Sequence, residues 1–563
     1  MAQIYFDSAY EGVTRTGSES QPYLDPSELP APWTIAGGNA YFFKRGSEWN
    51  FTQSFKLAAF TTSAISIGAY GDESSQRPII RCYRLIDSSE CTEVSLSFTI
   101  GVAAMTTTPA SGTNLWRVPA SFLGLFEGDI WGVAVDPTRT IIGGGDDVAP
   151  AAAREYTSLN TDTNTYRVVY SEGNPVTVYG GLYASNMSLA DSVNWEASRS
   201  IYVVNAGGGC PVSDIQFDLC RAPIRFYRAL TTDTINYKRM PDNNIIDCVL
   251  TRAAIGFEYA CDDTVIGSGY GFERVRVRGN YGENLGRSFI DTSSSSGSIC
   301  LNDTRIYENV CNGFGQSYST GGIYLARVNT TDGSHVMVDR NTMSGGISGN
   351  IWPEDGHAFY QEIDSQDLMF RDNFSWNNDQ NFICYIGGRR VAFVANVAVA
   401  KANTFDDLSR MFTHTSMKAE SNTLFHGNVA VGLKNLVTSY DLGRIARSAV
   451  ISGNVSLCDV ASGGSGLTVN TNALRFGGHD TTYVTVDGNA LSGHDNSWFD
   501  TTAWSAYNTA PQINNPVAGD FSAEVARIPV PTDPTVNYAL QIRPGARIVN
   551  GTVDLRPGTR LVV

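Results

Sequence analysis

The chain has 563 residues, of which 42% are hydrophobic and 17% charged, a composition typical of a folded protein with a large core. The formal charge of -16 and the absence of any Lys/Arg run argue against nucleic-acid binding, which relies on basic patches. No stretch approaches the ~20 apolar residues of a membrane span. The opening "MAQIYFDSAYEG" has neither a basic nor an apolar leader region, so no secretory signal is expected.

The first part of the chain, residues 1–190, has long aromatic-rich strands and lacks the asparagine repeat that follows later. We expect this part to form an N-terminal cap and the first coils of the fold, with an inserted β-rich subdomain. Helical periodicity is almost absent here and in the rest of the chain, which indicates an all-β protein.

A short unit recurs in the second half: an apolar residue, two further residues, an asparagine, and then apolar-polar alternation. Successive members stand 23 to 35 residues apart from Asn341 onward. A repeat of this length built from short strands predicts a β-solenoid, here a parallel β-helix over residues 191–500. The members are centred on Asn280, Asn341, Asn373, Asn396, Asn428, Asn454 and Asn489, with Asn309 as a further member.

Each of these asparagines is expected to do two things. It tolerates the left-handed backbone conformation at a tight bend between strands, and its amide stacks on its counterparts in a hydrogen-bonded ladder. An aromatic residue precedes each bend, and we expect these aromatics to stack as one column in the core. The column comprises Tyr324, Tyr360, Tyr385, Tyr440 and Phe476.

The end of the chain, residues 501–563, loses the asparagine signal and gains proline. We expect it to cap the open end of the stack, which would otherwise expose unpaired strand edges, or to join partner chains.

The ten cysteines include no CxxC pair, and several stand in strand-like runs such as "NFICYIGG". A zinc site of the usual spacing is therefore not expected, and we assign no other metal and no cofactor. Buried free thiols are the simpler interpretation, and they fit a chain that folds in a cytoplasm.

The segment "IWPEDGHAFYQEID", residues 351–364, gathers acids around a predicted strand "HAFYQ". Glycoside hydrolysis needs two carboxylates, for which Glu354, Asp355, Glu362 and Asp364 are the candidates. Lyase chemistry instead needs a base and a cation. His357 or Tyr360 could supply the base, and Arg327 or Arg389 the cation.

Trp352 and Trp376 are candidate platforms on which a sugar could stack. Each of these assignments has a structural alternative. The acids could be solvated turn residues, the histidine could be a hydrogen-bonded turn residue, and the tryptophans could belong to the core.

Four segments also resemble a known family. The segments "GGNAYFFKRGSEWNF" and "AISIGAYGDESSQRPII" resemble the opening of right-handed parallel β-helix proteins that act on polysaccharides. "EDGHAFYQE" is similar to a segment common in the repeats of that family, and "NNPVAGDFSA" to its terminal turn. The resemblance implies a right-handed parallel β-helix with a short C-terminal β cap. The reaction stays open, because the family includes lyases, hydrolases, epimerases and non-catalytic binders.

With no signal peptide and reduced cysteines, the resemblance is closest to bacteriophage tailspikes and tail fibres. It implies a homotrimer in the virion tail that contacts other phage tail proteins and binds, and by hydrolysis or lyase chemistry depolymerises, a bacterial surface polysaccharide. A non-catalytic glycan-binding fibre and a cellular polysaccharide lyase or hydrolase are the alternatives.

Overall fold

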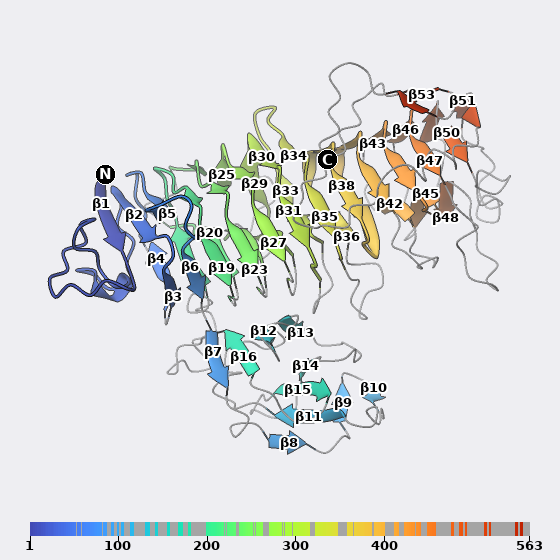
Figure 1. Cartoon of the computed structure of the whole chain (residues 1–563). Helices are drawn as coiled ribbons and strands as arrows, with labels where there is room; N and C mark the ends of the chain where they lie inside the picture. Colours follow the sequence, from blue (N-terminus) through green and yellow to red (C-terminus); the bar gives the residue numbers. More distant parts are fainter. Residues whose placement is uncertain are drawn as a thin grey trace.

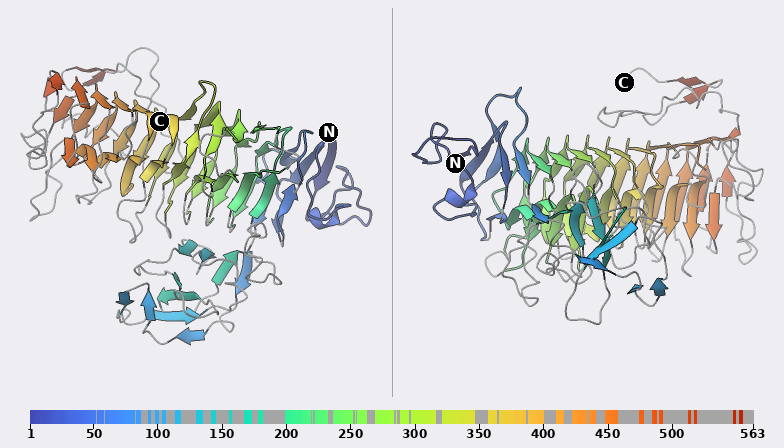
Figure 2. Two further views of the ribbon diagram at one scale, coloured as in Figure 1. Left: turned by 180° about the vertical axis from the view of Figure 1, so that it is seen from behind. Right: turned by 60° about the horizontal axis from the view of Figure 1, so that its bottom comes forward.

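The structure is a computed structural model. It describes residues 1–262, 269–346, 357–399, 410–415, 422–440 and 448–457, with short gaps. Within 82–198, and again within 474–554, it describes only separate strands. Three long parallel sheets run along a single stack of coils, from the blue N-terminal end to the orange and red end in Figure 1 and in both views of Figure 2. Every strand pair within these sheets is parallel, which confirms the predicted parallel β-helix.

Sheet A has fourteen strands. They are β1 (Ala2–Phe6), β2 (Asn39–Lys44), β5 (Ser66–Tyr70), β18 (Val212–Ser213), β22 (Ile245–Ile246), β26 (Arg276–Arg278), β30 (Thr304–Tyr307), β34 (Val336–Asp339), β37 (Gln366–Arg371), β40 (Arg389–Val394), β43 (Asn422–His426), β46 (Ser448–Ser452), β49 (Val484–Asp487) and β51 (Gln512–Asn514).

Sheet D has thirteen strands. They are β3 (Glu48–Asn50), β6 (Ile79–Arg81), β19 (Gln216–Asp218), β23 (Val249–Thr251), β27 (Tyr281–Glu283), β31 (Val310–Asn312), β35 (Thr342–Ser344), β38 (Phe374–Trp376), β41 (Val397–Val399), β44 (Val429–Val431), β47 (Val455–Leu457), β50 (Ala490–Ser492) and β52 (Val517–Ala518).

Sheet C has eleven strands. They are β4 (Phe55–Leu57), β17 (Arg199–Val204), β20 (Ala222–Arg228), β24 (Phe257–Cys261), β28 (Ile290–Ser294), β32 (Ile323–Ala326), β36 (His357–Glu362), β39 (Gln380–Tyr385), β42 (Arg410–Thr415), β45 (Asn435–Tyr440) and β48 (Leu474–Gly477). Each coil passes from sheet C to sheet A, then to sheet D, and back to sheet C. A short parallel sheet lies between sheets C and A, with strands β21 (Arg239–Pro241), β25 (Gly271–Glu273), β29 (Ile299–Asn302) and β33 (Val328–Asn329).

Two further groups of strands stay outside these sheets. Those between β6 and β17 form small antiparallel sheets of their own, and the last two strands, β53 (Arg547–Val549) and β54 (Thr552–Asp554), form a hairpin. The first group comprises β7 (Tyr83–Ile86), β8 (Thr92–Val94), β9 (Phe98–Ile100), β10 (Ala103–Met105), β11 (Thr113–Arg117), β12 (Ile130–Ala134), β13 (Ile141–Gly144), β14 (Glu155–Thr157), β15 (Arg167–Glu172) and β16 (Val178–Gly181). Among the described residues the single helical element is a 3-10 turn, Pro26–Glu28, and no helix there is long and apolar enough to cross a membrane.

The first strand, β1, is the free edge of sheet A, and a neighbouring loop covers it. The backbone N–H of Tyr5 donates to the carbonyl of Gly17, and Tyr23 exchanges hydrogen bonds with Tyr5 and Asp7. The edge that could otherwise pair with another chain is therefore occupied by residues of the same chain.

The predicted asparagine ladder is present. Each amide Nδ2 donates to the Oδ1 of the next asparagine at 2.8 to 3.0 Å, and the backbone N–H of each donates to the same oxygen. The side chains are at most 1% exposed. The ladder runs through Asn280, Asn309, Asn341, Asn373, Asn396, Asn428 and Asn454; Asn489 lies outside the described residues.

The expectation that the asparagine itself takes the left-handed conformation is wrong. The residue before it does, because the asparagine has to turn its amide inward to reach its counterparts. The residues with positive φ are Glu308, Arg340, Asp372 and Ala395, with φ of 53 to 57°, and Gly279, Gly427 and Gly453, with φ of 61 to 65°. Glycine adopts this conformation without the steric cost that Cβ imposes on the others.

The expected aromatic column is present where its side chains are described: the rings of Tyr324 and Tyr360 meet at 5.2 Å, and those of Tyr360 and Tyr385 at 6.2 Å. Tyr385 stands two positions beyond Ile383, the backbone partner of Tyr360. The expected place in the core is wrong, because Tyr324 and Tyr385 are only partly buried and alternate along their strands with the core residues Leu325 and Cys384.

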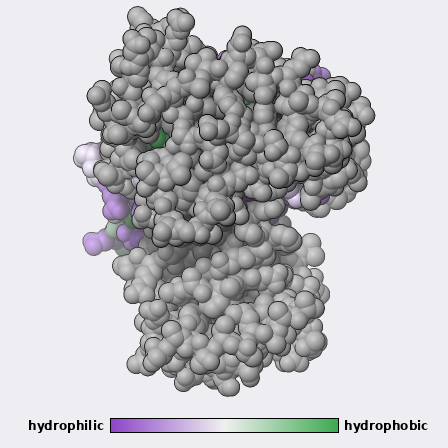
Figure 3. Space-filling model, turned by 90° about the vertical axis from the view of Figure 1, so that its right-hand side faces the viewer, coloured by the Kyte–Doolittle hydropathy of each residue, from purple (hydrophilic) through white to green (hydrophobic). Residues whose placement is uncertain are grey.

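Phenylalanines form the aromatic stacks inside the solenoid. The rings of Phe359 and Phe382 stack at 4.8 Å, and those of Phe370 and Phe393 at 4.9 Å. These side chains are fully buried, and each alternates along its strand with residues of the opposite face. Where described residues reach the surface at the left edge of Figure 3, which looks onto the end of the stack, their colour is mainly hydrophilic.

Candidate functional site

The outer face of sheet C carries one row of aligned polar and aromatic side chains. Their neighbours along each strand, such as Phe226, Phe257 and Ile290, belong to the core, so the row points away from it. We call this set the sheet-C row. It consists of Lys56, Tyr202, Arg225, Glu258, Asp291, Tyr324 and Tyr360, each aligned with the next.

The N-terminal end of the row combines cations with aromatic rings. Lys56 Nζ lies 5.7 Å from the ring centre of Tyr202, and the Arg225 guanidinium lies 6.0 and 5.0 Å from the rings of Tyr202 and Tyr227. The two tyrosine rings stack at 6.2 Å. Burial, with the nearby Asp262 carboxylate, raises the pKa of Tyr227 to about 12. At neutral pH this end therefore offers a neutral aromatic surface held in place by two cations.

Two carboxylates stand next to each other in the middle of the row. Glu258 and Asp291 occupy paired positions on adjacent parallel strands, which lie ~4.8 Å apart. Arg225 Nε approaches Glu258 Oε2 at 3.5 Å, and Ser288 Oγ donates to Asp291 Oδ2 at 2.7 Å. The two residues are 8% and 2% exposed, so both acids are held in fixed surroundings and largely shielded from water.

The C-terminal end of the row includes two residues predicted from the sequence. The rings of Tyr324 and Tyr360 meet edge to face at 5.2 Å. The Tyr324 hydroxyl donates to Oε2 of Glu362, which ends strand β36 one coil away. The strand predicted at "HAFYQ" is confirmed, and it places Tyr360 and Glu362 on the same outer face.

His357 begins the same strand and is fully buried. His357 pairs with Gln380 in the same register as Phe359 with Phe382, and the rings of His357 and Tyr360 lie 5.5 Å apart. Nε2 contacts Thr413 Oγ1 at 3.2 Å, and Nδ1 has no hydrogen-bond partner. Burial and the nearby Arg410 hold the pKa of His357 well below its usual range. These surroundings favour a packed, neutral imidazole.

The buried His357 predicts a pH dependence of stability. Its pKa is lower in the folded chain than in the unfolded chain, so between the two values the unfolded chain binds more protons. The free energy of unfolding should be unaffected by His357 above about pH 6.5. As the pH falls below that value, the free energy of unfolding should decrease by up to about 1.4 kcal/mol per pH unit. Urea titrations from pH 7 to pH 5 should show a steeper loss for the wild type than for His357→Gln. Parallel losses would show that His357 does not carry the effect.

The other predicted residues lie at different places. Arg327, in the turn after β32, donates its backbone N–H to the carbonyls of Glu362 and Ile363, so it lies beside the end of β36. Arg389 begins β40 on sheet A and is exposed. Trp376 lies on the outer face of sheet D, against a separate apolar cluster. Trp352, Glu354, Asp355 and Asp364 lie outside the described residues.

Glu258, Asp291 and Arg225 were not predicted as site residues from the sequence. A signal was present: "FEYAC" and "FIDTS" each hold one acid within an otherwise strand-like apolar run. The first segment precedes Asn280, and the second lies between Asn280 and Asn309. The repeat therefore could not show that the two acids occupy equivalent positions in neighbouring coils.

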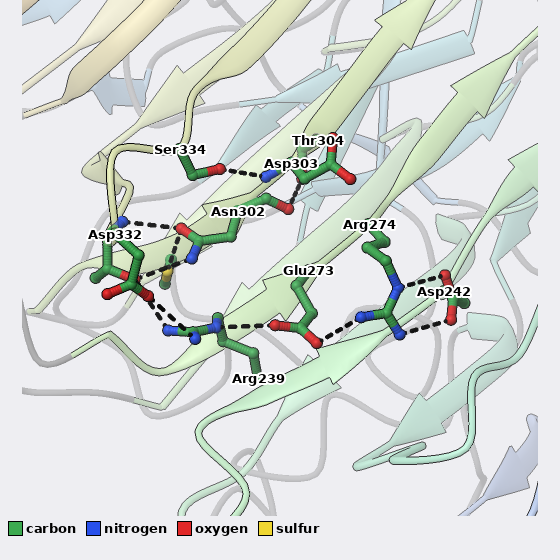
Figure 4. Close-up of polar contacts among 11 residues, drawn as sticks. Arg239, Asp242, Glu273, Arg274, Asn302, Asp303, Thr304, Asp332 and Ser334 are labelled. Carbon is green, nitrogen blue, oxygen red and sulfur yellow. Dashed lines mark hydrogen bonds and ion pairs between the residues drawn. The ribbon is translucent and has the colours of Figure 1, made fainter.

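A second polar cluster lies on the short sheet between sheets C and A. Glu273 accepts from Arg239 at 3.0 Å and from Arg274 at 2.8 Å, and Arg274 also contacts Asp242 at 2.9 Å (Figure 4). The carboxylates are engaged by arginines of the same or neighbouring coils, and partly exposed pairs of this kind contribute little stability. We interpret this cluster as scaffold. Among the described residues, no three metal-ligating side chains gather in one place.

The sequence matches no protein-family model and no curated protein. Among solved structures, the chain is similar to XylC in complex with xylose, with 10% identity, 91% of this chain and 86% of that chain covered, and a TM-score of 0.47. It is also similar to a GH136 lacto-N-biosidase from Eubacterium ramulus, with 12% identity, 92% and 68% covered, and a TM-score of 0.41. Neither similarity assigns a role to any residue of this chain.

Proposed function

We propose that this chain binds and cleaves a bacterial surface polysaccharide along the sheet-C row, as the tailspike or tail fibre of a bacteriophage. The observation that carries the proposal is the aligned pair Glu258 and Asp291, set between aromatic side chains on the outer face of a long solenoid. Sugars stack on aromatic faces, and glycosidic bonds are cleaved by two carboxylates.

Strands ~4.8 Å apart suit the retaining form of hydrolysis, in which the two carboxyl groups lie about 5–5.5 Å apart. Glu258 is the better nucleophile, because Arg225 stabilises its negative charge. In the first step its oxygen bonds to the anomeric carbon, while Asp291 gives a proton to the departing glycosidic oxygen. In the second step Asp291 takes a proton from water, whose oxygen displaces Glu258 from the sugar.

The phage assignment rests on the resemblance of the sequence and on the thiols. The seven cysteines whose surroundings are described are all buried thiols, as in proteins that fold in a reducing cytoplasm. A homotrimer in the virion tail, attached to other tail proteins and folded before release from the host, belongs to the same proposal.

A non-catalytic glycan-binding fibre is the second candidate. One observation favours it: Arg225 contacts Glu258, and Ser288 donates a hydrogen bond to Asp291. Carboxylates that already have such partners fit a rigid binding surface better than proton transfer. The two candidates predict different products.

Incubating the purified protein with capsular and O-antigen polysaccharides separates them. We expect new reducing ends without the ultraviolet absorbance of an unsaturated uronate, because the row offers a carboxylate pair. Unsaturated product would assign the reaction to a lyase and move the site toward His357 and Tyr360. Retained binding with neither product would leave the binding fibre as the function.

A further inference from the structure

Exposed apolar side chains gather at the corner where the chain passes from sheet C to sheet A. Among the residues whose surroundings the structure describes, four large apolar side chains are exposed. Met1 and Val13 belong to the first residues of the chain. Leu230 and Tyr237 are 37% and 44% exposed, and both lie in one connection, residues 229–238, between β20 and β21. Scattered exposed apolar side chains are common, whereas grouped ones mark contact sites.

The ring of Tyr237 packs against the ring of Phe60, with the ring centres 4.8 Å apart. Phe60 follows strand β4, which lies two strands before β20 in sheet C, so the connection 229–238 reaches back across one whole coil. A Cβ atom at Gly207, in the coil between, would come within 2.9 Å of the Phe60 ring, so a glycine there makes room for the ring. We call Phe60, Leu230 and Tyr237 the corner surface.

A buried arginine holds this connection in place. Arg228, the last residue of β20, is fully buried, and its Nη2 donates to the carbonyl of Tyr237 at 2.7 Å. Its guanidinium also lies 5.2 Å from the ring centre of Tyr270, and Nη1 contacts Asn205 Oδ1 at 3.4 Å. Because the chain itself fixes the backbone at Tyr237, a ligand that binds there loses little free energy to ordering the connection.

The corner surface adjoins the N-terminal end of the sheet-C row. Lys56, the first member of the row, lies in β4, and Phe60 lies in the connection that follows this strand. Three strand spacings of ~4.8 Å, about 14 Å, separate β4 from β24, which carries Glu258. The stacked rings of Tyr202 and Tyr227 stand on the two strands between them. A sugar at the corner surface therefore lies on the same face of the stack but out of reach of the carboxylates.

We propose that the corner surface is a distal sugar-binding subsite, on which the polysaccharide rests several sugar units away from the bond that is cleaved. The apolar face of a sugar stacks on an aromatic ring, and Tyr237 offers an exposed ring supported from behind by Phe60. This inference rests on the proposed function, because it takes the ligand to be the glycan of the sheet-C row.

The size of the corner surface favours a sugar over a protein partner. A stable protein interface takes about 20–30 residues a side, whereas this surface has three, and its exposed neighbours Thr231 and Lys238 are polar. A sugar ring, by contrast, covers little more than one aromatic side chain.

Tyr237→Ala in the full-length protein tests the proposal. We expect binding to immobilised capsular or O-antigen polysaccharide to weaken about three- to tenfold, the effect of losing one aromatic contact. In cleavage of the polymer the loss should fall on KM, with kcat changed less than about twofold, because the subsite touches no reacting atom. Oligosaccharides too short to span the ~14 Å between β4 and β24 should be cleaved as by the wild type. Tyr237→Phe keeps the ring and should restore polymer binding.

Tyr281→Ala is the matched control, since Tyr281 is a partly exposed tyrosine on the outer face of sheet D, and it should bind polymer as the wild type does. Equal polymer binding by Tyr237→Ala and the wild type, with both proteins folded by circular dichroism, would overturn the distal subsite and leave the proposed function intact. The same would follow from an equal loss with short oligosaccharides. A wild-type protein that binds none of these polysaccharides would refute the proposed function, and the subsite with it.

Discussion

Replacing Asn373 with alanine will lower the free energy of unfolding by about 3–5 kcal/mol, because buried hydrogen-bonding groups lose their partners at 1–3 kcal/mol each. Asn373 Oδ1 accepts from the backbone N–H and the amide of Asn341 at 3.1 and 2.9 Å. Its own amide donates to the Val338 carbonyl at 2.8 Å and to Asn396. Water cannot replace these bonds at a side chain that is 1% exposed. Urea-induced unfolding followed by tryptophan fluorescence measures the effect.

Asn39→Ala is the matched control. Asn39 is an asparagine outside the ladder, partly buried, with one side-chain hydrogen bond of 3.2 Å to the Tyr41 hydroxyl. We expect a loss below about 1 kcal/mol there. Equal losses at the two positions would contradict the view that the ladder is a cooperative support of the stack.

Glu258→Gln and Asp291→Asn should each lower the rate of polysaccharide cleavage by at least about 100-fold, the smaller end of the usual contribution of general acid–base catalysis. Both substitutions keep shape and hydrogen-bonding capacity, while they remove the charge or the transferable proton. Glycan affinity should change much less than the turnover rate, because the stacking tyrosines stay in place. Reducing-end release and binding to immobilised polysaccharide measure the two quantities.

Glu273→Gln provides the control for charge removal at a scaffold cluster. It should leave cleavage unchanged, since Glu273 lies on the short sheet and pairs with Arg239 and Arg274. Full activity of both Glu258→Gln and Asp291→Asn, with the fold intact, would move the search for the reaction to the predicted residues near β36.

The stack could be predicted from the sequence because its signal is local. An asparagine at a two-residue bend between short strands recurs in each of these coils, even though the other connections differ in length. Asn373 and its counterparts are therefore enough to identify the coils. Strand β36 was predicted for the same reason, since "HAFYQ" is short and apolar. The left-handed backbone conformation was predicted at Asn373 but occurs one residue earlier, at Asp372. The reason is that the backbone at Asp372 sets the direction in which the Asn373 amide points.

The site was harder to predict because it depends on alignment between coils. Glu258 and Asp291 become neighbours only through the parallel pairing of β24 and β28, and the lengths of the intervening turns hide that pairing in the sequence. Trp376 shows the complementary difficulty. In "FSW" the alternation is clear, but nothing local says whether the serine or the aromatic residues face the interior.

The bends between sheets A and D have consequences for how this protein can change over evolution. From β18 onward each of these bends contains two residues, whereas the connection into sheet C ranges from three residues in 377–379 to sixteen in 458–473, and residues 82–198 lie in an equivalent connection. From β18 onward, the variation in length between coils is thus found at the corners that border sheet C. We expect homologous chains to differ in length at these corners, even by a whole subdomain, while the strand register between sheets A and D stays the same.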